Sequence, residues 1–137
     1  MIVTTDIGNI LYRDCKAFGI GEIYQKGNIP LIPDDTDYRM KTERIVIRPK
    51  SQSPDTYWKK GFVEVNLCVP DVGIGIANLI RIAELEHQSV EILGDVVNSY
   101  NGIPYQYSIE SIGTEVDTAL KCHYVNVRIL FEVLNVN

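Results

Sequence analysis

The closing segment of the chain, residues 121–136, constrains the fold more than any other part. From residue 125 to residue 133, every second position carries a large apolar side chain, namely Val125, Val127, Ile129, Phe131 and Val133. Alternation with a period of two places all of these side chains on one face of a β-strand. A strand with one apolar face needs a sheet that is covered on one side only, which favours an antiparallel or mixed sheet over a buried parallel one.

The remaining elements follow from the same kind of periodicity. Residues 4–18 predict an amphipathic helix, with Thr4 or Thr5 as its cap and Gly19 as its end. The other segments predict strands at 20–25, 43–48, 61–69 and 105–112, a helix at 71–93, and turns at 94–104 and 113–119. The prediction is one α+β domain over residues 1–137, with an antiparallel or mixed sheet of four to five strands. Two helices cover one face, in the order α-β-β-β-α-β-β.

The second predicted helix carries an apolar stripe. The members of this stripe recur at helical spacing: Ile76, Leu79, Ile80, Ala83, His87 and Val90. We expect the stripe to pack on the sheet, and His87 to be a partly buried residue of the core.

Composition limits the classes of function. The net charge is -5, from 18 acidic and 13 basic residues. This balance disfavours long-range attraction to nucleic acids and to anionic membranes. The three cysteines form no C-x-x-C pair, which indicates reduced thiols. The sequence shows no secretory signal and no apolar run long enough to cross a bilayer, so we expect a protein kept in a cytoplasm.

The segment Gly73-x-Gly75-x-x-Asn78 resembles a dinucleotide-binding turn at the start of a helix. Asn78 stands where the third glycine belongs, and the surrounding strands alternate as those of a doubly wound sheet do not. A flexible helix entry or a turn at an interface is the favoured interpretation. A small ligand-binding module or enzyme that uses this turn stays open as an alternative.

Other candidate sites are incomplete. Cys122 and His123 are neighbours in a predicted strand, so their side chains point to opposite faces and cannot act as a pair. The acidic cluster of Asp34, Asp35 and Asp37 lacks the glycine and terminal glutamate of a calcium-binding EF-hand loop. The sequence therefore predicts no catalytic residue, no metal site and no cofactor.

Two long polar loops, near 26–40 and 49–60, are candidates for contacts between subunits. Trp58 either anchors the entry of the following strand or anchors such an interface, because tryptophan is enriched where interfaces derive most of their affinity. The candidate interface residues are Asp34, Asp35, Asp37, Tyr57, Trp58, Lys59 and Lys60.

The order of elements resembles that of phage tail completion proteins, and of tail terminators in particular. Residues 55–71, from Asp55 through Trp58 to Pro70-Asp71, are similar to the middle of that family, where an alternating strand ends before a long helix. Asn78, Arg81 and Glu84 lie on that helix, and residues 124–133 resemble the closing strand of the family.

The resemblance implies a virion structural protein, present in the host cytoplasm during assembly. It implies a homo-oligomeric ring, commonly a hexamer, that caps the tail tube and joins the tail to the head. The expected partners are the tail tube protein and head–tail connector proteins, with no membrane and no sequence-specific nucleic acid. The family implies neither catalysis nor a cofactor. A head-completion protein of the neck could share the same layout.

Overall fold

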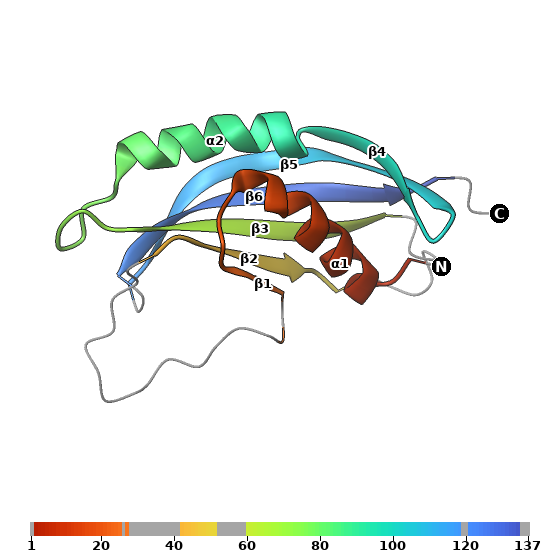
Figure 1. Ribbon diagram of the computed structural model, residues 1–137, viewed down its shortest axis with the longest axis horizontal. Coiled ribbons are helices and arrows are strands. Elements are labelled where there is room, and N and C mark those ends of the chain that lie inside the picture. The colour runs from red at the N-terminus through yellow and green to blue at the C-terminus, as the bar shows by residue number, and fades with distance from the viewer. Residues whose placement is uncertain (1, 26, 28–41, 52–59, 119–120, 135–137) are drawn as a thin grey trace.

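The computed structural model describes residues 2–25, 27, 42–51, 60–118 and 121–134. These residues form a curled six-stranded sheet with two α-helices on one face, an α+β fold (Figure 1). The strand order is β1-β2-β3-β6-β5-β4, and every neighbouring pair is antiparallel except the parallel pair β1–β2. The strands are β1 (Ile23–Gln25), β2 (Arg44–Pro49), β3 (Lys60–Pro70), β4 (Asp95–Tyr100), β5 (Ile103–Asp117) and β6 (Cys122–Val133).

The central pair of strands, β3 and β6, supplies the floor of the core. Side chains alternate as the sequence predicts, so that Val65 and Leu67 on β3 and Val127 and Ile129 on β6 are all completely buried. Helices α1 (Thr4–Cys15) and α2 (Leu79–Leu93) send their buried residues into the same cluster. The predicted covering of one sheet face by two helices is confirmed.

The first helix begins by a different cap from the one predicted. Thr4 already lies inside α1, and the residue before it, Val3, donates its N–H to the Asp6 carboxylate over 3.0 Å. The Asp6 carboxylate therefore accepts the backbone N–H at the start of the helix, a start that we expected a threonine hydroxyl to cap. A 3-10 turn, η1 (Lys16–Phe18), extends the helix to Gly19, whose left-handed φ of 74° ends it as predicted.

The predicted strand count is too low, because residues 94–104 contain a strand. Strand β4 occupies the region expected to be turns, and Asn101-Gly102 forms a tight hairpin into β5 with φ values of 50° and 78°. Asn-Gly is a signal for a β-hairpin, whereas the predicted elements have only turns over residues 94–104. Strand β5 also continues through residues 113–117, which were expected to be a turn, and pairs with β6 throughout.

Residues 71–78 connect β3 to α2 and are called the arm below. The prediction that the second helix starts at residue 71 is wrong, because α2 begins only at Leu79. Pro70 ends the preceding strand, and the two glycines of the arm favour a turn over helix. Within the described residues, neither helix is long and apolar enough to span a membrane.

Candidate functional site

The arm is a tight turn that projects beyond the end of the sheet, drawn in green at one end of the long axis (Figure 1). The Val72 N–H donates to the Ile76 carbonyl over 2.9 Å, and the Ile76 N–H donates to the Gly73 carbonyl over 3.2 Å. Gly75 has a φ of 68°, a conformation that glycine adopts without strain. Ile74 lies between the two glycines at the tip, and 87% of its surface is exposed.

Polar contacts hold both ends of the arm against the sheet. At its start, the Asp71 carboxylate is 2.6 Å from Nδ1 of His123 on β6, and the Asp71 side chain is nearly buried. Just beyond its other end, in the first turn of α2, the Arg81 guanidinium makes two bonds to Glu43, the residue before β2, from Nε over 2.7 Å and from Nη2 over 3.0 Å. Hydrogen bonding to Glu43 is the main cause that raises the pKa of Arg81. A turn fixed in this way keeps its shape before any partner arrives.

Asn78 is the N-cap of α2. Its side-chain oxygen accepts the Arg81 backbone N–H over 3.2 Å. The position that would hold the third glycine of a dinucleotide turn therefore caps the helix itself. The two glycines lie in the turn of the arm, which is closed by its own backbone bonds.

The apolar stripe that the sequence assigned to the core faces solvent, and that prediction is wrong. Exposed fractions are 59% for Ile76, 70% for Leu79, 79% for Ile80 and 59% for Val90. Ala83 and His87, also in this stripe, are exposed as well. We call these six residues the outer stripe. A second set of residues faces the core instead: Ile82, Leu85, Ser89 and Leu93.

Helix α2 thus has two apolar faces, and periodicity alone could not tell which one packs on the sheet. The inner face includes Ser89, whose hydroxyl would be costly to bury alone. Its donation to the Leu85 carbonyl over 2.7 Å satisfies it within the helix. The missed signal was a second apolar face on the same helix, since a helix that is apolar on more than one side normally buries both sides.

The arm and the outer stripe lie on one continuous stretch of the chain, and together they expose a large apolar surface. A fully buried aliphatic side chain removes roughly 60–120 Å² of apolar surface from water. Six large aliphatic side chains of the arm and the outer stripe are exposed; Val72 is 66% exposed, and the values for the other five are given above. Together these six side chains leave on the order of 400 Å² of apolar surface in contact with water. The largest apolar patch on a typical monomer covers about 300–600 Å² and is often functional. The six are Val72, Ile74, Ile76, Leu79, Ile80 and Val90.

A pocket of about 340 Å³ adjoins the base of the arm. It lies between the arm and the far end of the β5–β6 hairpin, and its walls include Asp71, Val116 and Lys121. This is the location in which a ligand-binding module that uses the Gly73–Asn78 turn would hold its ligand.

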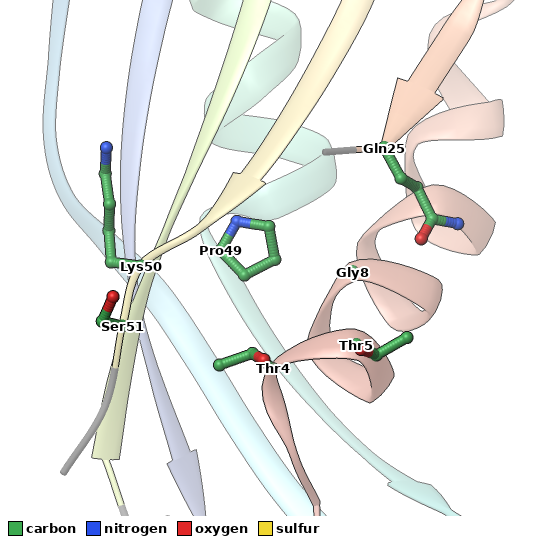
Figure 2. A pocket seen from close by; sticks show the side chains of 7 residues that line it. All are labelled: Thr4, Thr5, Gly8, Gln25, Pro49, Lys50 and Ser51. Atoms are coloured by element: carbon green, nitrogen blue, oxygen red, sulfur yellow. The ribbon is translucent and has the colours of Figure 1, made fainter. Parts of the chain in front are cut away.

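A second pocket, of about 170 Å³, lies where the start of α1 passes the ends of β1 and β2 (Figure 2). A Cβ placed on Gly8 would lie 3.2 Å from Oε1 of Gln25 and 3.5 Å from Cγ of Pro49. The absence of a side chain at Gly8 therefore lets the helix approach both strands. We call this the α1 pocket, and its lining residues are Thr4, Thr5, Gly8, Gln25, Pro49, Lys50 and Ser51.

The neighbouring Cys122 and His123 point to opposite faces of the sheet, as the strand geometry predicts. Cys122 is completely buried beside Cys68, on the face away from the helices, while His123 contacts the arm. The hydrogen bond from Cys122 lowers the pKa of Cys68 and raises that of Cys122, and Arg44 lowers the pKa of Cys68 further. Among the described residues, no group of three or more His, Cys, Asp or Glu side chains is arranged to hold a metal ion.

Most residues of the predicted interface lie outside the described part of the chain. This applies to the acidic cluster Asp34, Asp35 and Asp37 and to the aromatic segment Tyr57, Trp58 and Lys59. Lys60 is described, and it is exposed at the start of β3. The loops near 26–40 and 49–60 therefore stay predictions. The sequence offers the Gly73–Asn78 turn as a helix entry or an interface turn, but it does not predict that the outer stripe is exposed.

Comparison with known proteins gives a fold and no family. No protein-family model matches the chain, and no curated protein is significantly similar to it. A solved structure matches it with a TM-score of 0.51 and 15% sequence identity, covering 98% of this chain and 96% of the other. Sequence identity this low shows a shared fold alone.

Proposed function

We propose that this chain is a structural subunit that assembles with copies of itself into a ring, and that the ring serves as a tail terminator or tail completion element of a phage or prophage virion. The observation that carries the assembly part is the exposed apolar surface of the arm and the outer stripe. The proposal includes no catalytic step and no cofactor.

The size of this surface suits a contact between proteins. A standard interface buries about 800 Å² on each partner, a little more than half of it apolar. The exposed apolar surface of the six side chains, on the order of 400 Å², is close to that apolar share. The polar contacts of Asp71 and Arg81 hold the arm in one shape, so little conformational entropy is lost when a partner binds.

The tail terminator role rests on a resemblance to phage tail completion proteins. The order of elements is similar to theirs, and so are residues 55–71 and 124–133. In this role the ring, hexameric in the commonest case, would close the tail tube and meet head–tail connector proteins. It would assemble in the host cytoplasm and stay in the virion. A head-completion protein of the neck is the nearest alternative, and it would use the same exposed surface.

Sedimentation velocity over a range of concentrations, followed by negative-stain electron microscopy, tests the proposal. We expect the purified chain to form a closed ring, and the double variant Leu79→Ser/Ile80→Ser to form smaller species. The matched control is Val97→Ser on β4, which removes a side chain of similar exposure, 69%, from outside the arm and the outer stripe. Strictly monomeric wild-type protein, alone and mixed with polymerised tail tube protein, would contradict the proposal.

A second candidate function is a small-molecule binding module, favoured by the pocket of about 340 Å³ at the base of the arm. A thermal-shift screen with nucleotides and divalent metal ions tests this alternative, because a ligand of the native state raises the melting temperature. A rise that is abolished by Val116→Trp in the pocket wall would favour the module over the ring.

A further inference from the structure

We propose that Cys68 and Cys122 form a site of reversible oxidation, in which Cys68 reacts with hydrogen peroxide and Cys122 then closes a disulfide with it. The site lies on the face of the sheet away from the helices. It goes beyond the proposed ring and does not depend on it.

The two thiols are neighbours on adjacent antiparallel strands. Cys68 of β3 pairs with Tyr124 of β6, and Cys122 pairs with Pro70, so the two cysteines are diagonal neighbours on one face of the sheet. They pack together in a small cluster of their own, and Tyr124 packs against them. A hydrogen bond joins the two side chains, so the sulfur atoms are adjacent before any oxidant arrives.

The register places the pair at the end of both strands. Pro70 ends β3, and Cys122 begins β6 directly after Lys121, whose φ is 55°. Diagonal neighbours have Cα atoms about 7–8 Å apart, whereas a disulfide usually spans at most about 6.8 Å. The bond therefore needs a shift of about 1 Å, which the frayed end of a ladder makes more easily than its middle. A disulfide closed under such strain is readily reduced again, as a reversible modification requires.

Cys68 is the thiol better suited to attack the oxidant. It lines a pocket of about 300 Å³ in the open face of the sheet, whose walls include Arg44 and Arg48. The hydrogen bond from Cys122 lowers the pKa of Cys68. The charges of Arg44 and Arg48 lower this pKa further, although burial and Asp117 act in the opposite direction. Reactive cysteines occur in electropositive surroundings of this kind, because the thiolate is the nucleophile.

The exposure of the two thiols assigns their roles. Only 5% of Cys68 is exposed, so the pocket admits a small oxidant such as hydrogen peroxide and excludes a bulky aromatic thiol reagent. Cys122 is completely buried. Its hydrogen bond to Cys68 and its burial raise the pKa of Cys122, which therefore keeps its proton. Cys68 is thus the attacking thiol, and Cys122 is the thiol that resolves the product.

The oxidation proceeds in two balanced steps. The Cys68 thiolate attacks one oxygen of hydrogen peroxide, the O–O bond breaks, and the leaving hydroxide takes a proton from solvent and departs as water. Cys68 is then a sulfenic acid. The Cys122 sulfur attacks the sulfenic sulfur, the S–O bond breaks, and the hydroxide leaves as water with the Cys122 proton. Two thiols and one hydrogen peroxide give one disulfide and two waters.

Thiol counting on the full chain tests the site. The reduced protein, freed of reductant, is treated with hydrogen peroxide without denaturant. The remaining thiols are then alkylated in urea and counted by intact mass spectrometry. We expect labels on all three cysteines before oxidation and on Cys15 alone afterwards. A digest of the oxidised protein should contain a peptide in which Cys68 and Cys122 are linked, two hydrogen atoms lighter than its two parts.

Three variants separate the roles of the thiols, and circular dichroism checks that each is folded. Cys68→Ser should slow the oxidation of Cys122 at least ~10-fold, because the attacking thiol is gone. Cys122→Ser should hold Cys68 as a sulfenic acid, which dimedone traps. The matched control is Cys15→Ser, which removes a buried thiol from the core on the other face of the sheet. It should form the Cys68–Cys122 disulfide at the wild-type rate.

Unlabelled thiols decide the outcome. Three labels after peroxide treatment, or a disulfide that forms only in urea, would overturn the proposal. Oxidation of Cys15 as fast as that of the pair would also overturn it, because unfolding would then expose all three thiols alike. None of these results depends on whether the chain forms a ring, so the two proposals fail separately.

Discussion

The bidentate ion pair between Arg81 and Glu43 should be a measurable contributor to stability, because it ties the start of α2 to the sheet. Its two bonds, 2.7 and 3.0 Å, have the parallel geometry that guanidinium and carboxylate groups prefer. Both side chains are about one quarter exposed, at 25% and 27%. We therefore expect more than the 0.2–1 kcal/mol or so of a surface pair and less than the ~3–5 kcal/mol lost on breaking a buried one.

Our expected coupling energy is about 1–1.5 kcal/mol, measured by a double-mutant cycle of Arg81→Met, Glu43→Gln and the double variant. The cycle is needed because Arg81 also contacts Glu84 over 3.0 Å, and its loss alone would mix the two contributions. Urea unfolding followed by circular dichroism gives the free energies of unfolding. In a domain of this size about 1 kcal/mol corresponds to a fall of about 3–5 °C in melting temperature.

The loss of Arg81 should also loosen the arm. With Arg81 released, backbone amides of the arm should exchange with deuterium faster, and self-association should weaken although no contact residue has changed. A coupling energy below ~0.3 kcal/mol would contradict this prediction, because the pair would then behave as two independent surface charges.

Three further predictions concern the core, a helix end and the thiols. Leu67→Ala, at a completely buried position of β3, should lower the free energy of unfolding by about 2–5 kcal/mol in urea titrations, and a loss below ~1 kcal/mol would contradict its placement. Gly19→Ala should cost about 1–2 kcal/mol in the same assay, because its left-handed φ strains other residues; a neutral result would oppose the assigned helix end. We expect no reaction with Ellman's reagent at Cys15, Cys68 and Cys122 until urea unfolds the chain. All three thiols are buried, and burial raises the pKa of Cys15. Rapid labelling of the folded protein would contradict this packing.

The sequence was informative where one face of an element is plainly polar. The alternation of Val125, Val127 and Ile129 with polar residues predicted both the strand β6 and its buried face. It was less informative at β4, which pairs along one side only and carries mostly exposed side chains. Only Val96 and Tyr100 of this strand are partly buried against the core, too few to set a clear alternation, and its main signal is the Asn101-Gly102 turn.

The surface that supports the proposed assembly was visible in the sequence and was assigned to the wrong side. The spacing of Ile76, Ile80 and Ala83 predicts one helix face well, but Ile82, Leu85 and Leu93 form another. The choice between them depends on tertiary contacts, because the core cluster takes up Ile82, Leu85 and Leu93. The arm was read as part of the helix because its apolar residues continue the same spacing.

In the proposed ring, the arm and the outer stripe hold copies of this chain together. Native mass spectrometry can compare the wild-type chain with Leu79→Ser/Ile80→Ser and with the control Val97→Ser. We expect one closed oligomer for the wild type and the control, and mainly monomer for the double variant. The same closed oligomer from all three proteins would contradict it, because the exposed apolar face would then play no part in assembly.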